Sequence, residues 1–171
     1  MAELADAVRT TPFDRQITAS KAGILLESIL DNLCLRYRCR VARSADSSYT
    51  LGELLDATTA LFKKAEVRRP ALEPTGQPMN PPQFTTSKPD DVLGKLRALA
   101  FIRNQVGAHF NVSGLEIADS DVEGFADLTV QFADALSCPR CGQIPSRDAE
   151  THFECSCPST MAVQMSPIRV S

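Results

Sequence analysis

The sequence predicts an all-α fold: a bundle of four to five helices, followed by a small module built around a cysteine knuckle. Two observations carry this prediction. Apolar residues recur at spacings of three and four in several separate segments, which is typical of amphipathic helices. Four of the six cysteines also lie close together near the carboxy-terminal end, after the last helical segment. With 171 residues, of which 43% are hydrophobic and 23% charged, the chain has the size and composition of one ordinary domain with a small appendage.

The amino-terminal region contains the first helix. Residues 2–9 are expected to add a short helical turn. Thr18 precedes the main segment, expected at about residues 19–36. The apolar stripe of this segment comprises Ala22, Leu25, Leu26, Ile29, Leu30 and Leu33. Cys34 follows the same pattern and is interpreted as a small core residue. Residues 36–43 alternate in part and are interpreted as a short extended segment with most of its arginines on one face.

A capping box begins the second helix, which is expected at about residues 51–65. In this motif the Thr50 side chain caps the helix and the Glu53 side chain reaches back to the cap residue. Residues 66–89 then carry six of the eleven prolines. Prolines at that density cannot continue a helix or a central strand, so we expect a long surface loop here.

Two further start signals predict the third and fourth helices. The sequence Ser-Lys-Pro-Asp-Asp, which begins at Ser87, combines a cap residue, an early proline and acidic side chains at the positive end of the helix dipole. It predicts a helix over about residues 90–107 that ends near Gly107. The sequence Ser-Asp-Val-Glu, which begins at Ser120, is a second capping box and predicts a helix over about residues 121–137.

These elements divide the chain into three expected parts. A helical bundle covers residues 1–137 and includes the proline-rich loop. A metal-binding module covers residues 138–160, with a short strand expected at residues 151–154. The tail, residues 161–171, shows no usable pattern.

The four clustered cysteines have the spacing of a metal site. Cys138 and Cys141 form a compact C-x-x-C knuckle, followed by a glycine that relieves the turn, and Cys155 and Cys157 supply a second pair. Four thiolates in tetrahedral reach select Zn²⁺ over hard cations and leave no open position, which predicts a structural, zinc-ribbon-like site. Because the C-x-C pair is tighter than the usual C-x-x-C pair, the alternative that His152 replaces one thiolate stays open.

The overall composition excludes some classes of function. A formal net charge of -3 argues against a generally basic nucleic-acid coat protein, but not against a local basic patch. The absence of Trp and an aromatic content of 6% argue against broad base-stacking surfaces. No run approaches the ~20 apolar residues that span a bilayer, and the first residues begin no signal peptide. We therefore expect a soluble, cytoplasmic protein.

Arg103 is the most informative single residue. On a helical wheel it lies near the middle of the apolar stripe of the third helix. An unpaired guanidinium is costly to bury, so Arg103 needs a carboxylate partner, for which Glu27 and Asp31 are candidates, or reaches a cleft or subunit interface. His109 lies about 120° away on a regular helix unless Gly107 bends it. A purely structural interpretation also stays open, with Arg103 in a core ion pair and His109 at the helix end.

The segment from Arg103 to His109 resembles the R-x(4–6)-H motif of HEPN domains. These are small helical bundles, often dimeric, and many are metal-independent endoribonucleases. A wider resemblance covers about residues 17–160 and follows three motifs: Y-T-L-G-E-L-L from Tyr49, R-N-Q-V-G-A-H-F-N from Arg103 and C-P-R-C-G from Cys138. Their order resembles the carboxy-terminal region of RecF/SMC-like ATPases from bacterial anti-phage loci. The chain has no G-x-x-x-x-G-K-[ST] phosphate loop, so the resemblance implies a module separate from such an ATPase, which becomes a candidate partner.

The HEPN resemblance implies a reaction as well as a fold. The 2′-hydroxyl of RNA would attack the adjacent phosphate, with His109 moving the proton and Arg103 stabilising charge on the phosphoryl oxygens. Asn104 would orient the phosphate or His109. The reaction requires no metal, and DNA would be inert because it lacks the attacking hydroxyl. The resemblance thus implies a homodimeric RNA endonuclease or RNA-binding effector of a prokaryotic defence system.

Basic side chains offer a second type of RNA contact. The densest run comprises Arg36, Arg38, Arg40 and Arg43, and a second run comprises Lys63, Lys64, Arg68 and Arg69. Such runs bind phosphates but are more often solvated surface, so both interpretations stay open. The alternative function is of another class: a non-catalytic interaction module that docks on an SMC-like ATPase or on nucleic acid, with Arg103 structural.

Overall fold

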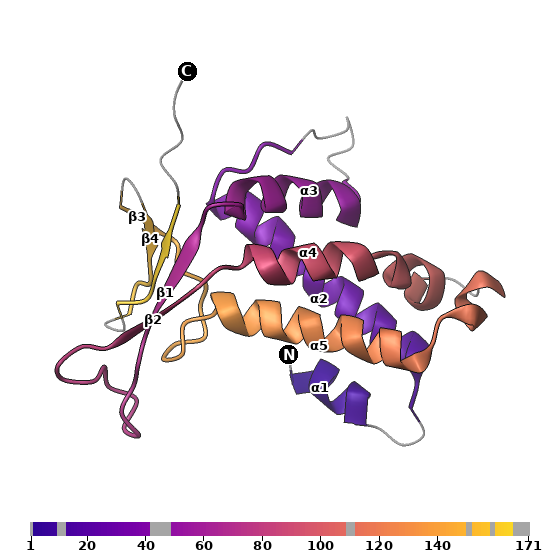
Figure 1. Ribbon diagram of the computed structural model, residues 1–171, viewed down its shortest axis with the longest axis horizontal. Helices are drawn as coiled ribbons and strands as arrows, with labels where there is room; N and C mark the ends of the chain where they lie inside the picture. The colour runs from indigo at the N-terminus through magenta and orange to yellow at the C-terminus, as the bar shows by residue number, and fades with distance from the viewer. Residues whose placement is uncertain are drawn as a thin grey trace. The chain divides into compact units, whose positions relative to one another are not determined.

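A computed structural model describes residues 2–9, 13–41, 49–108, 112–149, 152–157 and 160–165. The chain forms two compact units, whose elements are labelled in Figure 1. Unit 1 comprises Met1–Thr58 and Val92–Ala133, and unit 2 comprises Thr59–Asp91 and Asp134–Ser171. Each unit is therefore built from two separate stretches of sequence.

Unit 1 is helical. It contains all or most of α1 (Ala2–Arg9), α2 (Arg15–Arg36), α3 (Leu51–Phe62), α4 (Asp90–Leu99) and α5 (Asp119–Leu136). Two short helices, the π-helical η1 (Arg103–Ala108) and the 3-10 helix η2 (Val112–Glu116), connect α4 to α5. The largest fully buried side chains of the core are mostly leucine and phenylalanine, among them Leu26, Leu30, Leu33, Leu93, Leu96 and Phe125. The amphipathic patterns of the sequence thus identified real helices.

The first main helix begins earlier than the sequence predicts. Asp14 is its N-cap, because the Asp14 side chain accepts a hydrogen bond of 2.9 Å from the Ile17 backbone N–H. Thr18, expected to precede the helix, lies buried inside it. The end at Arg36 agrees with the prediction. The residues after it do not begin an extended segment, since Arg38 adopts a left-handed φ of 54° that turns the chain.

The capping box of α3 is confirmed, and α5 starts slightly before its own. The Thr50 backbone N–H donates to Glu53 Oε2 at 2.7 Å, and the Glu53 N–H donates to Thr50 Oγ1 at 3.3 Å. In α5, Thr129 is a polar residue within the apolar stripe. Its buried hydroxyl donates to the carbonyl of Phe125, one turn earlier, at 2.9 Å, which satisfies the hydroxyl without a partner from another element.

The third helix is shorter than predicted. The sequence predicts one helix over residues 90–107, but α4 ends at Leu99 and the chain continues into the π-helical turn η1. Hydrogen bonds in a π-helix span one residue more than in an α-helix, so the turn is wider and the faces that follow are rotated. A helical wheel with a constant angle per residue cannot anticipate this rotation.

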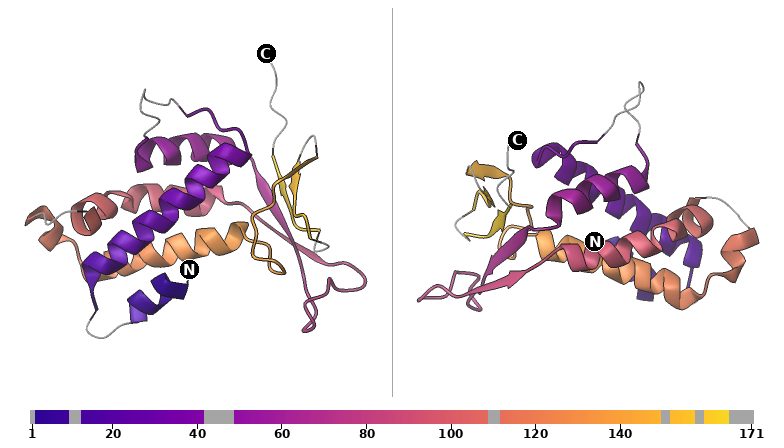
Figure 2. Two further views of the ribbon diagram at one scale, coloured as in Figure 1. Left: turned by 180° about the vertical axis from the view of Figure 1, so that it is seen from behind. Right: turned by 45° about the horizontal axis from the view of Figure 1, so that its top comes forward.

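The all-α prediction is wrong, because unit 2 contains a five-stranded antiparallel sheet with strand order β2-β1-β5-β4-β3. The protein is therefore mixed α/β. The strands are β1 (Glu66–Pro70), β2 (Phe84–Ser87), β3 (Arg147–Ala149), β4 (His152–Glu154) and β5 (Ala162–Gln164). In both views of Figure 2 the yellow carboxy-terminal strands lie beside β1.

The proline-rich segment supplies two of these strands. Residues 66–89 were expected to form a loop, but β1 and β2 pair along their length, with Pro70 opposite Phe84. A proline is tolerated there because β5 pairs only with Glu66, Val67 and Arg68 of β1, so Pro70 has no β5 residue opposite it that requires an N–H donor. The prolines between the two strands lie in their connection.

The carboxy-terminal tail supplies the strand that joins the sheet together. β5 lies within residues 161–171, for which the sequence predicts no structure. Val163 lies between Val67 of β1 and Phe153 of β4, and both valines are fully buried. One buried valine in a strand of this length produces no periodic signal. The strand expected at residues 151–154 is confirmed as β4.

Candidate functional sites

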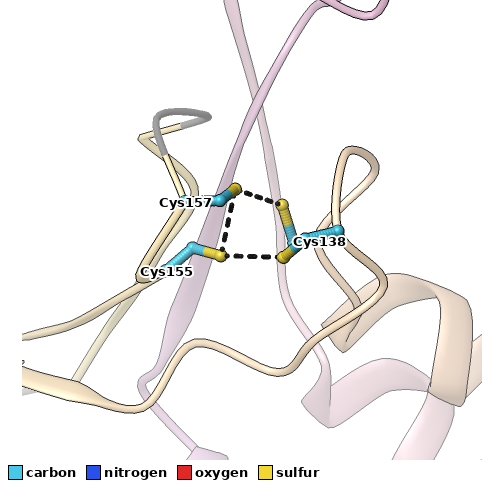
Figure 3. Close-up of side chains that lie close together, drawn as sticks. Cys138, Cys155 and Cys157 are labelled. Atoms are coloured by element: carbon cyan, nitrogen blue, oxygen red, sulfur yellow. Dashed lines mark hydrogen bonds between the residues drawn. The ribbon is translucent and has the colours of Figure 1, made fainter.

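The first candidate site is a cluster of thiols in unit 2. All four predicted ligand residues contribute, with their sulfur atoms within 4.8 Å of one another: Cys138, Cys141, Cys155 and Cys157. Figure 3 shows the sulfur atoms of Cys138, Cys155 and Cys157 lying close together. Cys157 Sγ lies 3.6 Å from Cys138 Sγ and 3.4 Å from Cys155 Sγ. Cys141 Sγ lies 3.3 Å from Cys155 Sγ.

Backbone hydrogen bonds fix both halves of the cluster. After α5 the chain turns sharply, with the Gly142 N–H donating to the Cys138 carbonyl at 2.8 Å and the Cys138 N–H donating to the Gln143 carbonyl at 2.9 Å. Gly142 has a φ of 71°, which confirms the role predicted for a glycine after the knuckle. The second half lies between β4 and β5, where the Cys155 N–H donates to the Met161 carbonyl at 2.9 Å. The cluster is therefore tied to the register of the sheet.

The geometry of the cluster fits a tetrahedral metal ion. Zn–S bonds of ~2.3 Å place the four sulfur atoms of such a site ~3.8 Å apart, close to the three separations above. The donors are thiols alone, which suits a soft or borderline metal. His152 is not one of the group, and its Nε2 lies 2.8 Å from Glu154 Oε1. The four cysteines therefore suffice to hold a metal ion without His152.

Burial affects the protonation of the cluster. Desolvation raises the pKa of the Cys155 thiol to about 12. This thiol therefore keeps its proton at neutral pH unless a metal ion replaces it. Because a metal binds the thiolate, binding releases this proton and becomes dependent on pH.

The second candidate site lies in unit 1, where η1 approaches α2 unusually closely. Gly23 of α2 leaves room for the Arg103 side chain, whose Cγ occupies the place that a Cβ on Gly23 would need. A Cβ on Gly107 would lie 2.7 Å from the Ser20 backbone nitrogen. Both glycines are therefore required by close approach. They allow the Arg103 stem to cross α2.

The Arg103 guanidinium is paired. Its Nη2 donates to Glu27 Oε2 at 3.0 Å and forms an ion pair with Glu27 Oε1 at 2.9 Å, and its Nη1 donates to Asn104 Oδ1 at 3.0 Å. The Arg103 and Glu27 side chains are each 31% exposed. Of the two candidate partners, the structure selects Glu27, while Asp31 accepts a hydrogen bond from the Tyr49 hydroxyl. The position of Arg103 in an apolar stripe is thus explained by a carboxylate on the facing helix.

A cavity of about 750 Å³ opens beside this pair. That volume lies within the range of small-molecule sites. Its walls combine two carboxylates, one guanidinium, an amide and two aromatic rings: Glu27, Asp31, Arg103, Asn104, Tyr49 and Phe101. The lining therefore offers hydrogen-bond donors for phosphate oxygens, acceptors for amino groups and an apolar surface for a ring.

The predicted catalytic residues are only partly described. Arg103 and Asn104 lie side by side and are joined by a hydrogen bond. His109 lies outside the described residues, as does Arg43 of the first basic run. The other three members of that run are exposed: Arg36, Arg38 and Arg40.

The arginines of the second basic run have structural contacts in unit 2. The Arg69 guanidinium donates to the carbonyl of Ser137 at 2.8 Å and also to the carbonyl of Asp134. These hydrogen bonds connect β1 to the end of α5. The Arg68 guanidinium lies 3.7 Å from the centre of the Phe84 ring, across the β1–β2 pair. These contacts favour a structural role for the two arginines over RNA binding.

The sequence-based prediction names Glu27 and Asp31 as candidate partners of Arg103 but assigns no role to Gly23, which completes this surface of α2. Gly23, Glu27 and Asp31 follow one another at intervals of four, which places them on one face of α2. This face receives Arg103 and lines the cavity. The spacing itself was a readable signal, but the glycine gained meaning only once its neighbour was known.

Comparison with known proteins adds no relative: no protein-family model, curated protein or solved structure matches the chain. The HEPN resemblance therefore rests on the sequence motifs. Within the described ranges, none of the helices combines the length and the apolar composition that a membrane crossing requires.

Proposed function

We propose that this chain is a HEPN-type, metal-independent endoribonuclease or RNA-binding effector of a prokaryotic defence system. The observation that carries the proposal is the placement of Arg103 and Asn104 on the wall of a cavity of about 750 Å³, at the start of a π-helical turn. Single π-helical turns occur frequently at functional sites. A guanidinium held at a cavity wall is suited to bind a phosphate.

In this proposal each residue has a separate task. Glu27 orients the guanidinium of Arg103, which has further N–H groups to donate to a phosphate oxygen of RNA. Asn104 orients the phosphate, and His109 moves the proton of the attacking 2′-hydroxyl. The arginines of the first basic run bind neighbouring phosphates of the same strand: Arg36, Arg38, Arg40 and Arg43.

RNA cleavage without added divalent metal tests the proposal. Purified protein is incubated with mixed RNA and with DNA of the same sequence. We expect cleavage of RNA only, with 2′,3′-cyclic phosphate ends. His109→Ala and Arg103→Ala should each lower the rate at least about a hundredfold, since general acid–base catalysis and charge stabilisation are each of this order.

Arg97→Ala is the matched control. Arg97 is also an arginine of unit 1 in an ion pair, at 2.7 Å from Asp56, but both side chains are more than half exposed and neither lines the cavity. We expect this variant to cleave at the rate of the wild type. Equal cleavage by wild type and His109→Ala would contradict the proposal and point to another site.

The Arg103–Glu27 pair also favours a second candidate, a docking module for an SMC-like or RecF-like ATPase. An arginine with a purely structural role would also pack its stem against Gly23 and form a half-buried ion pair with a neighbouring helix. This candidate predicts no RNA cleavage by the purified chain, alone or with the ATPase. It predicts instead a stable complex with the ATPase that His109→Ala does not weaken.

We also propose that the protein is a homodimer that uses α2. Three large apolar side chains on this helix are exposed, at 49%, 59% and 58%, and their spacing of seven and eleven places them on one stripe: Ile17, Ile24 and Leu35. Ile24→Asp should convert a dimer to a monomer in light scattering. Leu115→Asp, at an equally exposed leucine of η2, should leave the dimer unchanged.

For the thiol cluster, we propose that the bound metal is Zn²⁺ in a structural role. Support comes from four thiol donors, tetrahedral spacing and the absence of a fifth donor within the group. The metal would hold the two cysteine-bearing turns of unit 2 together. Elemental analysis of the purified protein should give about one zinc per chain, and about none after Cys141→Ser and dialysis.

A further inference from the structure

Two cysteines at the end of α2 belong to neither site. Cys34 lies in the last turn of the helix and is 8% exposed, and Cys39 follows it and is half-buried. Neither is part of the thiol cluster of unit 2. From the sequence alone, Cys34 was interpreted as a small core residue. Their mutual arrangement gives them another role.

The helix ends in a Schellman turn, and this turn brings the two cysteines together. Tyr37 is the C-cap, and Arg38, which follows it, has the left-handed φ of 54° that this motif requires and that glycine usually supplies. The Cys39 N–H donates to the Cys34 carbonyl at 2.9 Å, the long hydrogen bond of the motif. The motif typically packs the side chains of these two positions against each other. Here both side chains are thiols.

The two thiols are chemically unequal. The neighbouring Cys39 thiol lowers the pKa of Cys34 to about 7, and the same interaction raises the pKa of Cys39. The Thr58 hydroxyl, 3.5 Å from Cys34 Sγ, lowers the Cys34 pKa further. Near neutral pH Cys34 is therefore partly thiolate, the nucleophilic form, while Cys39 keeps its proton.

We propose that Cys34 and Cys39 form a reversible intrachain disulfide when the protein meets a small peroxide. The Cys34 thiolate attacks one peroxide oxygen, the O–O bond breaks, and the products are a sulfenic acid and hydroxide. The Cys39 sulfur then attacks Cys34 Sγ, the S–OH bond breaks, and the Cys39 proton leaves with the hydroxide as water. In sum, two thiols are oxidised to one disulfide and one hydrogen peroxide is reduced to two waters.

The surroundings favour a small oxidant and suggest what the bond changes. Because Cys34 is only 8% exposed, a peroxide reaches it more readily than a bulky disulfide does. The bond would lock the Schellman turn and therefore fix the direction in which Arg38 and Arg40 leave the helix. This inference stands on the geometry of the turn and is independent of the proposed ribonuclease activity.

Peptide mapping tests the proposal on the metal-loaded full chain. The protein is treated with about one equivalent of hydrogen peroxide, remaining thiols are alkylated, and trypsin is added. Trypsin cuts after Arg36 and Arg38, so Cys34 and Cys39 fall on separate peptides that only a disulfide joins. We expect the joined peptide as the first oxidation product, and its loss after dithiothreitol.

Cys39→Ser is the control that keeps the test independent of folding, because Cys39 is the more exposed partner. Circular dichroism should match the wild type. With the second thiol removed, oxidation should stop at the Cys34 sulfenic acid, which a 1,3-diketone probe traps. The proposal is overturned if the joined peptide is absent while the cysteines of unit 2 oxidise, or if Cys39→Ser gives no trapped sulfenic acid.

Discussion

The two units of this protein are held together by different means. Unit 1 has a core of fully buried leucine and phenylalanine side chains, and its helices approach closely through Gly23 and Gly107. Unit 2 has three strands of only three residues each, together with the thiol cluster. Strands this short bury little apolar surface, and we therefore expect a metal ion bound by the cluster to add much of the stability of unit 2. Metal removal should therefore destabilise unit 2 more than unit 1, and changes in helix packing should destabilise unit 1 more than unit 2.

The largest expected effect concerns the metal proposed for unit 2. Cys138→Ser removes a buried thiol of the cluster. Structural zinc binding supplies on the order of 10 kcal/mol to small metal-dependent folds, so unit 2 should lose much of its stability. We expect hydrogen exchange in β4 and β5 to become fast, while the amides of α2 stay protected.

Cys39→Ser is the matched control for that experiment. It removes a partly buried thiol of unit 1 that is not part of the cluster. Exchange in β4 and β5 should then stay slow. If these strands also stay protected in Cys138→Ser, unit 2 does not depend on the metal and the comparison between the units fails.

The pH dependence of metal binding should be the next largest effect. Burial raises the pKa of the Cys155 thiol to about 12, so a proton must leave it before it can bind a metal. Lowering the pH favours the protonated, metal-free form, and apparent metal affinity should fall by about tenfold or more per pH unit. Competition with a chromophoric chelator between pH 8 and pH 6 measures this fall. The stability of α2 should change far less over that range.

Packing changes should act on unit 1 instead. A Cβ on Gly107 would lie 2.7 Å from the Ser20 nitrogen, and this backbone atom cannot move aside as a flexible side chain does. Gly107→Ala should therefore lower the free energy of unfolding of unit 1 by about 1–3 kcal/mol, the usual cost of overpacking. Urea denaturation followed by circular dichroism measures the change.

Gly94→Ala makes the same substitution in α4, where no atom lies within 4 Å of the added Cβ. Alanine is the better helix former, so this variant should be more stable by about 0.5–1 kcal/mol. If Gly107→Ala lowers the free energy of unfolding while Gly94→Ala raises it, the close approach of η1 to α2 is the cause of the destabilisation. A stabilised Gly107→Ala would show that the two helices can separate without cost.

The same contrast explains what the sequence predicts well. The helices of unit 1 follow from amphipathic stripes and from local caps such as Thr50 with Glu53, because each signal lies within a few residues of its effect. The thiol cluster of unit 2 follows from residue type and spacing. Its signals are local too, and they do not depend on the rest of the fold.

The sheet and the surroundings of Arg103 depend on distant partners. Val67 and Val163 become strand residues because they lie opposite each other, far apart in sequence. The π-helical turn that begins at Arg103 cannot be anticipated from a constant helical angle. Gly23 looks like an ordinary helix glycine until the Arg103 side chain is known to occupy its free side. Such features require pairing information that one sequence does not contain.

The last expected effect concerns the cap of α3. Thr50→Ala removes the side-chain oxygen that accepts the Glu53 N–H, and loss of an N-cap typically costs about 1 kcal/mol. Thr50→Ser keeps that oxygen and should leave the free energy of unfolding nearly unchanged. Urea denaturation with and without a metal chelator compares the two variants. The loss of free energy of unfolding in Thr50→Ala should be the same in both conditions, because the cap belongs to unit 1. If this loss disappears when the metal is removed, the stabilities of the two units are coupled through α3.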